Sequence, residues 1–239
     1  MALPMLAVKT FEVRQPSNDQ KIRLRPFLVA EEKLLLQSAS GTPNEVTDAV
    51  KQILERCVQG ETDFDAENLP SFDLEFLFLK LRAESVGSKV DLLLPHPDSE
   101  ECDRTEVQLN LQEVKVHFNK DHDKKIMLDK NIGVVMRYPT MRMIANLGDA
   151  QMSETEASFA LLENCIETVF TKDGETHAFA DADREEKEQF IDSMSTDQFM
   201  KLQEFFTGMP ALRHTIHVKR CVTCGQPFDY EVSGLQSFF

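Results

Sequence analysis

Apolar residues change their spacing several times along the chain, and each spacing predicts an element. Residues 11–24 alternate apolar and polar positions around the turn-forming stretch Pro-Ser-Asn-Asp, which predicts a β-hairpin. Apolar positions recur at helical spacing within residues 28–36, which predicts a short amphipathic helix. A clearer helix is predicted within residues 42–60, because Thr42 and Glu45 have the spacing of a capping box.

A third predicted helix, within residues 69–87, is apolar on every side near its middle. Ser71 is expected to cap it, and Asp73 and Glu75 stand near the positive end of the helix dipole, which favours them. The run Phe76–Leu79 covers all faces of the helix. Such a helix is buried on most sides, either in its own fold or against another subunit.

The middle of the chain alternates apolar and polar residues at period two. Residues 89–95 and 106–118 both show this alternation. The second stretch slips in phase at Gln112-Glu113, which predicts two strands or one bulged strand. Further strands are expected within residues 120–128 and 131–140. Together they predict a small central sheet, a β-meander.

Helical spacing returns at residue 153 and gives way to strands near the end of the chain. Ser153 and Glu156 predict a capping box for a helix whose apolar face runs to Val169. Two more helices are expected within residues 181–210. Residues 212–232 predict a terminal hairpin with two cysteines in its turn.

These patterns predict an α+β protein: an N-terminal β-hairpin and helices, a central β-meander, and a C-terminal helical group closed by a hairpin with a CxxC motif. Residues 1–150 form the expected N-terminal region with the meander. Residues 151–239 form the expected helical region with the CxxC hairpin and a Phe-Phe tail. The two regions are either separate domains or one continuous domain.

The composition is typical of a soluble globular protein kept in the cytosol. Of 239 residues, 41% are hydrophobic and 28% charged. No apolar run reaches the roughly 18 residues of a membrane span, and the first residues lack the basic flank of a secretory signal. The five cysteines are odd in number and scattered, which excludes a disulfide framework.

The formal net charge of −15 argues against non-specific binding to nucleic acid, which needs a dense basic surface. Most of the negative charge lies in residues 37–106 and 146–207. These segments are either a solvated helical exterior or a surface that steers the protein toward basic partners.

The stretch CVTCGQPF, residues 221–228, offers two cysteines for metal or redox chemistry. A redox CxxC obtains its reactive thiolate from the start of a helix, whereas this pair lies between two alternating runs. A tight turn after a strand, followed by Gly225, is instead typical of half a zinc site. The competing interpretation is two reduced thiols that merely tighten a turn.

A structural zinc site needs four ligands, and one CxxC supplies two. His214 and His217 would point to opposite faces of a strand, so they are not expected to share a metal. Cys57 and Cys165 are expected in helix cores, while Cys102 lies in a polar loop. The CxxC turns of two chains are another source of four thiolates. Zinc is the one cofactor that the sequence suggests; the metal candidates are Cys221 and Cys224, with His214 or Cys102 as weaker additions.

Catalytic motifs are not found. The sequence has no phosphate-binding GxxxxGK[ST] loop, no GxGxxG after a strand, no GxSxG and no HExxH. The stretch KDHDKK around His122 is typical of a solvated turn, and the acidic run 181–188 lacks the glycine-bearing pattern of a calcium loop. The sequence therefore predicts a protein that is not an enzyme.

The ending GLQSFF would leave two phenylalanines as an exposed apolar patch, so the tail is expected to dock, into its own chain or into a partner. The residues expected to bind partners are Leu235, Phe238, Phe239, Phe76 and Phe78.

Four blocks of the sequence, spread over its full length, resemble the T4-type bacteriophage baseplate hub assembly proteins. In chain order they are FEVRQPSNDQKIRLRPFLVAEEKLLL, NLPSFDLEFLFLKLRAESVG, NIGVVMRYPT and LRHTIHVKRCVTCGQPFDYEVSGLQSFF. The resemblance is to a whole protein rather than to one borrowed module. Within the last block, the residues matched to the family's ending are His214, Cys221, Cys224, Gly225, Gly234, Leu235, Phe238 and Phe239.

The resemblance implies a late, structural protein of a contractile-tailed phage, either a baseplate hub subunit or a hub assembly factor. Its implied partners are other phage baseplate hub or tail proteins, with a homo-oligomer left open, and neither nucleic acid nor a membrane span is expected. It implies a place in the host cytoplasm during assembly and in the virion tail baseplate. It carries over no catalytic residue. The alternative function is a zinc-ribbon adaptor or regulatory protein, in which the CxxC turn would recognise a partner.

Overall fold

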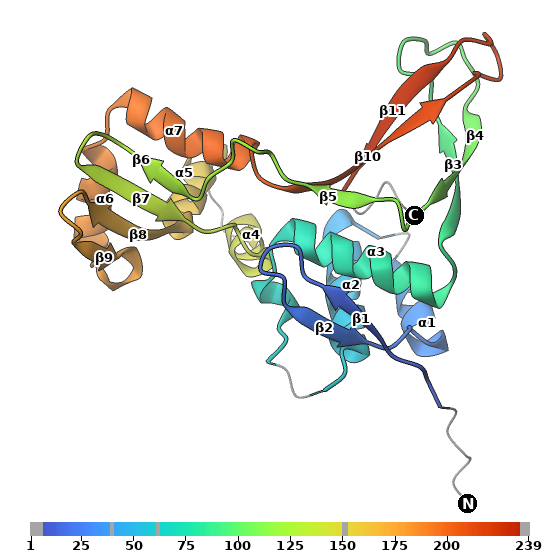
Figure 1. Cartoon of the computed structure of the whole chain (residues 1–239), viewed down its shortest axis with the longest axis horizontal. Coiled ribbons are helices and arrows are strands. Elements are labelled where there is room, and N and C mark those ends of the chain that lie inside the picture. Colours follow the sequence, from blue (N-terminus) through green and yellow to red (C-terminus); the bar gives the residue numbers. More distant parts are fainter. Residues whose placement is uncertain (1–6, 39–40, 61–62, 150–152, 235–239) are drawn as a thin grey trace, which may run out of the picture. The chain divides into compact units, whose positions relative to one another are not determined.

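The computed structural model describes residues 7–38, 41–60, 63–149 and 153–234 (Figure 1). The chain groups into two compact units. Unit 1 contains residues 1–117 and 211–239, and unit 2 contains the intervening residues 118–210. Helices and strands occur in both units, which confirms the mixed α+β class.

Unit 1 begins with a two-stranded hairpin. Strand β1 (Phe11–Arg14) pairs antiparallel with β2 (Lys21–Leu24), and Phe11 lies opposite Leu24. The inward positions of β2, Ile22 and Leu24, are buried, as the alternation predicts. Arg25 donates its backbone N–H to the carbonyl of Cys57 at 2.9 Å, which ties the hairpin to the end of a helix.

Three helices follow: α1 (Val29–Ser38), α2 (Pro43–Cys57) and α3 (Ser71–Ser85), with a short 3-10 helix, η1 (Ala66–Asn68), before α3. Helix α2 starts with the predicted capping box of Thr42 and Glu45, which satisfies free N–H groups of its first turn. The helix α3 is buried on most sides within its own unit. Its buried residues are Phe72, Asp73, Leu74, Leu77, Phe78, Leu79, Leu81 and Ala83.

The rest of unit 1 consists of strands. Strands β3 (Lys89–Leu94) and β4 (Thr105–Asn110) form a hairpin, while β5 (Lys115–His117), β10 (Ala211–Val218) and β11 (Phe228–Ser233) form a three-stranded antiparallel sheet in the order β11-β10-β5. Their inward side chains share one core with the C-terminal half of α3. In Figure 1 the β10–β11 hairpin lies beside the β3–β4 hairpin, although more than a hundred positions separate them in sequence.

Unit 2 is built on a four-stranded antiparallel sheet in the order β6-β7-β8-β9. The strands are β6 (Lys125–Met127), β7 (Ile132–Met136), β8 (Ile166–Thr171) and β9 (Thr176–Ala178). Helices α4 (Met141–Asp149), α5 (Glu154–Cys165), α6 (Arg184–Asp192) and α7 (Thr196–Thr207) and the 3-10 helix η2 (Phe179–Asp181) complete the unit. Leu162 of α5 and Leu202 of α7 belong to one buried core with the sheet.

The predicted central β-meander is wrong, because the strands of this region belong to three separate sheets. At the phase slip the backbone N–H of Glu113 donates to the carbonyl of Asn110 at 3.0 Å and forms a turn. That turn directs β5 away from β4, and β5 pairs with β10 instead. Strand β6 then pairs with β7, and β7 pairs with β8, which follows it in the chain after a helical connection.

The helix predicted to extend to Val169 ends at Cys165, and residues 166–171 form β8. The run IETVFT is rich in β-branched residues, which favour strands, and β8 pairs on both sides in the sheet. Tertiary pairing therefore overrides the helical spacing of Ile166 and Val169.

The C-terminal hairpin joins the N-terminal residues rather than the helices before it, because β10 pairs with β5. This grouping differs from the expected division after residue 150. Whether the units are independent domains stays a prediction.

Candidate metal site

The two cysteines of the CxxC motif occupy the turn between β10 and β11. The backbone N–H of Cys221 donates to the carbonyl of Gln226 at 2.8 Å, and that of Gly225 donates to the carbonyl of Cys221 at 3.1 Å. Gly225 has a φ of 75°, a left-handed conformation that glycine adopts without steric cost. The turn thus holds Cys221 buried and Cys224 exposed on one side of the hairpin tip.

A second segment, the loop of residues 95–104 between β3 and β4, is hydrogen-bonded to this turn. The backbone N–H of Asp103 donates to the Thr223 hydroxyl oxygen at 2.9 Å, and that hydroxyl lies 3.2 Å from the Asp103 carboxylate, to which it donates. The N–H of Val222 donates to the hydroxyl oxygen of Thr105 at 3.4 Å. These contacts fix the loop, with its side chains of His96 and Cys102, against the cysteine turn.

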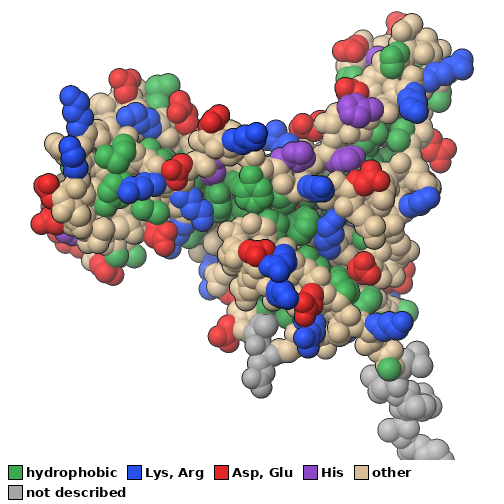
Figure 2. All heavy atoms as spheres, viewed as in Figure 1, with side chains coloured by type: hydrophobic (Ala, Val, Ile, Leu, Met, Phe, Trp, Pro, Cys, Tyr) green, Lys and Arg blue, Asp and Glu red, His purple; other side chains and the backbone are tan. Residues whose placement is uncertain are grey.

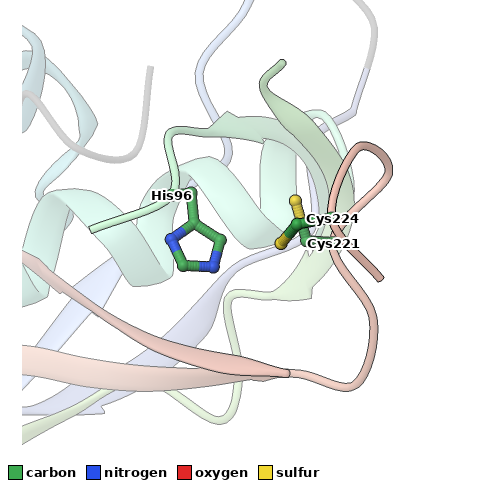
Figure 3. A group of neighbouring side chains, drawn as sticks. All are labelled: His96, Cys221 and Cys224. Carbon is green, nitrogen blue, oxygen red and sulfur yellow. The ribbon is translucent and has the colours of Figure 1, made fainter. Parts of the chain in front are cut away.

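His96, Cys221 and Cys224 converge (Figure 3). Each offers one donor atom, and the three atoms all lie within 4.8 Å of one another. The ring of His96 also packs on Phe228, with the ring centroids 4.7 Å apart. Cys102 is half-buried, packs against the core that contains Cys221, and interacts electrostatically with the thiols of Cys221 and Cys224. Three sulfurs and one imidazole are therefore gathered from two hairpins.

The turn stabilises negative charge on Cys221. The pKa of this thiol falls to about 6, mainly because the backbone N–H of Cys224 hydrogen-bonds to it; the N–H of Thr223 and the thiols of Cys224 and Cys102 add to the effect, and burial opposes it. A hydrogen bond with Ser99 lowers the pKa of Cys102, but burial and the interactions with the thiols of Cys224 and Cys221 together outweigh it, so the pKa is raised. A thiolate at neutral pH is the form of cysteine that binds metals.

The sequence placed Cys221 and Cys224 together and named Cys102 and His214 as weaker additions. Cys102 does lie against the pair, whereas His214 does not belong to the cluster. His214 lies within β10, four residues before its end, which is roughly 13 Å along the strand. Burial lowers the pKa of His214, and its titratable neighbours are Glu113, His117 and His217.

His96 was missed by the sequence analysis. The sequence feature that could have indicated it is its place just after the alternating strand, in the same polar loop as Cys102. Nothing in the local sequence shows that this loop meets residues 221–224, because the contact depends on the tertiary fold.

The other two cysteines are core residues, as predicted. Cys57 at the end of α2 and Cys165 at the end of α5 are both fully buried. Burial raises the pKa of Cys57 to about 11 and that of Cys165 to about 12. Both thiols are therefore protonated at neutral pH and poorly suited to metal binding.

The expected partner-binding residues fall into two groups. Leu235, Phe238 and Phe239 lie outside the described residues. Phe78 is fully buried in unit 1, and Phe76 is half-buried against the core that α3 shares with the strands, with the ammonium of Lys80 5.1 Å from its ring centroid. Contact of these two rings with a partner stays a prediction.

His122 is not the solvated turn residue that the sequence suggested. Its ring stacks near Tyr138 and Phe205, with centroid distances of 5.7 and 4.8 Å, and its Nε2 is buried without a hydrogen-bond partner. The ring borders a polar cavity of about 530 Å³ in unit 2. Burial lowers the pKa of His122, which keeps the ring neutral near pH 7.

Acidic and basic side chains are interspersed over the face shown in Figure 2. No helix within residues 7–38, 41–60, 63–149 and 153–234 combines the length and apolar character that crossing a membrane requires.

Comparison with known proteins gives one result. A family model described as T4 bacteriophage base plate protein matches residues 8–239, which include both units and the cysteine turn. No curated protein and no solved structure matches the chain.

Proposed function

The chain belongs to the T4 bacteriophage base plate protein family, and from this premise we propose that it is a subunit or an assembly factor of the baseplate hub. Family membership itself gives it a structural role in a phage baseplate, with other phage tail proteins as partners. The finer proposal is that it builds the hub through protein–protein contacts and without catalysis, in the host cytoplasm while the tail is assembled. A homo-oligomer stays a prediction.

The observation that carries this proposal is the extent of the family match. It runs from residue 8 to residue 239 and so includes the helices of both units as well as the cysteine hairpin. A zinc-ribbon adaptor would need only the hairpin and a second half of the metal site. The match over the whole fold therefore favours a baseplate role over that alternative.

Exposed apolar side chains on the helices of unit 2 support a role in protein contacts. Phe159 of α5 is 43% exposed and stacks on Phe199 of α7 with ring centroids 4.9 Å apart, and the neighbouring Met200 is 52% exposed. Aromatic and methionine side chains are enriched at protein interfaces. Burial of one such side chain by a partner contributes about 1.5–3 kcal/mol.

We also propose that the C-terminal tail is an anchor for a partner, and a truncation tests this. Deleting residues 235–239 should abolish co-purification with other baseplate proteins while leaving the far-UV circular dichroism spectrum unchanged. A double change of Phe238 and Phe239 to alanine should have the same effect, and the matched change of Gln236 and Ser237 to alanine should have none. Normal co-purification of the truncated chain would show that the tail is not an anchor.

Mass spectrometry of purified virions and of assembly intermediates distinguishes the two hub roles. A hub subunit is present in both samples at a constant ratio to the other baseplate proteins. An assembly factor is present in the intermediates and missing from the virions. Absence from both samples would refute the hub proposal.

A further inference from the structure

We infer that His96, Cys102, Cys221 and Cys224 form a structural zinc site that fastens two hairpins of unit 1 to each other. The first two residues come from the loop between β3 and β4, and the last two from the turn between β10 and β11. Three thiolates and one imidazole are a donor set that Zn²⁺ takes in closed structural sites. All four ligands belong to unit 1, so the zinc site can be tested without reference to the proposed hub role.

The donor atoms lie nearly as close together as a metal requires. Zinc–sulfur bonds of about 2.3 Å at tetrahedral angles place two sulfurs about 3.8 Å apart. The donor atoms of His96, Cys221 and Cys224 lie within 4.8 Å of one another, so a contraction of at most about 1.3 Å brings them to bonding distance. Cys102 lies outside this group of three but packs beside Cys221, and its thiol would move toward the ion to supply the fourth corner.

His96 has a nitrogen that lacks a partner. Its Nε2 is buried and makes no hydrogen bond, while its Nδ1 accepts the backbone N–H of Asp98 at 3.2 Å. An unpaired polar atom costs free energy when it is buried, so an ion bound at Nε2 would relieve that cost. Binding through Nε2 requires the proton of the neutral ring to sit on Nδ1, so Nδ1 can no longer accept the N–H of Asp98. Asp98 is exposed, and its N–H can then donate to water instead.

The protein positions the ligands by contacts that do not involve the metal. The hydrogen bonds of Asp103 with Thr223 and of Val222 with Thr105 hold the loop against the turn. Phe228 supports the ring of His96. A site whose ligands are already held in place loses less conformational entropy when it binds an ion.

A disulfide between Cys221 and Cys224 explains the gathering of these four side chains less well than a zinc ion does. It would consume two sulfurs and leave Cys102 and the Nε2 of His96 without partners. A single tetrahedral ion engages all four groups at once.

The zinc ion would close a long loop of the chain. Asp103 and Thr223, which flank the ligands, are 120 positions apart, and all of unit 2 lies between them. A link between such distant residues restricts the unfolded chain, so the bound ion stabilises unit 1 and keeps its C-terminal hairpin on the β3–β4 loop.

The test uses the full-length chain, purified without a metal-binding tag and kept reduced. Elemental analysis should find one zinc ion per chain, and exchange with Co²⁺ should give the intense visible absorption of a tetrahedral thiolate site. Replacing Cys102→Ser, Cys224→Ser or His96→Asn should weaken zinc binding by more than the roughly 10–100-fold typical of changes outside the ligand set. The matched controls His214→Asn and Cys57→Ala should keep the ion.

Chelation gives a readout that does not depend on any variant. Removing zinc from the wild-type chain should lower its melting temperature, and adding Zn²⁺ back should restore it. The site is refuted if the reduced wild-type chain, offered Zn²⁺ or Co²⁺, binds neither. It is equally refuted if the ligand variants retain zinc as firmly as the controls, or if Cys221 and Cys224 are found joined as a disulfide in the freshly isolated chain.

Discussion

Asp73 is a buried carboxylate in the first turn of α3, and its replacement by alanine should destabilise unit 1 strongly. The residue is 0% exposed. It accepts hydrogen bonds from the side-chain amide of Gln15 at 2.8 Å and from the backbone N–H of Ser17 at 3.0 Å. Its charge also lies at the positive end of the helix dipole, where a carboxylate is favoured. One side chain therefore connects the turn of the β1–β2 hairpin to a helix that follows more than fifty positions later.

The expected magnitude follows from these contacts. Each hydrogen bond to a charged acceptor contributes about 1.5–3 kcal/mol, so two give about 3–6 kcal/mol. Removing Asp73 also removes the cost of burying its charge, which offsets part of that loss. We expect Asp73→Ala to lower the free energy of unfolding by about 2–4 kcal/mol. Asp73→Asn, which keeps one acceptor oxygen, should cost about half as much.

Urea denaturation followed by far-UV circular dichroism measures the loss, since the chain has no tryptophan for fluorescence. Amide hydrogen exchange should show the loss in α3 and the β1–β2 hairpin and not in unit 2. A double-mutant cycle with Gln15→Ala isolates the energy of the pair. The reasoning is refuted if Asp73→Ala costs less than about 1 kcal/mol, or if the Gln15 and Asp73 changes are simply additive.

Two further predictions concern buried charge. Glu31 is 4% exposed and accepts hydrogen bonds from the Arg25 guanidinium through both carboxylate oxygens, at 3.1 and 3.2 Å. Glu31→Gln should lower the free energy of unfolding, measured by urea denaturation, by about 2–4 kcal/mol, and a loss under about 1 kcal/mol would contradict this prediction. Burial lowers the pKa of His122 in the folded chain below that of an unfolded histidine. As the pH falls below about 6.5, the unfolded chain therefore binds a proton at His122 more readily than the folded chain does, and the free energy of unfolding decreases. Thermal melting between about pH 7.5 and pH 5 should show a shallower decrease for His122→Phe than for the wild type, and equal slopes would show that His122 does not contribute.

Signals between residues close in sequence predicted three helix starts, whereas the expected cap at Ser71 is wrong, because α3 has Pro70 in the cap position and no side-chain cap hydrogen bond. Thr42 with Glu45, Ser153 with Glu156 and Ser195 with Gln198 form the capping boxes that their spacing predicts. A cap depends on residues three positions apart, so no tertiary contact is needed to recognise it.

Local sequence signals did not determine which strands pair with each other. Alternation showed that residues 106–118 are extended and half-buried, but it could not show that β4 pairs with β3 while β5 pairs with β10. The spacing of Ile166 and Val169 fits a helix face, and only the pairing of β8 with β7 and β9 makes a strand. Pairing energy comes from residues distant in sequence, so a local pattern cannot choose between partners.

The same division applies to the cysteine site. That Cys221 and Cys224 share a tight turn with Gly225 could be predicted from the residues alone, because the CxxC spacing and the flanking alternation are local. The approach of Cys102 and His96 to this turn depends on the folded chain, because the β3–β4 loop reaches the turn through packing of two hairpins that a long stretch of chain separates. The physical reason is that a turn is set by backbone geometry over a few residues, whereas a cluster of four donors depends on a shared core that brings remote segments together.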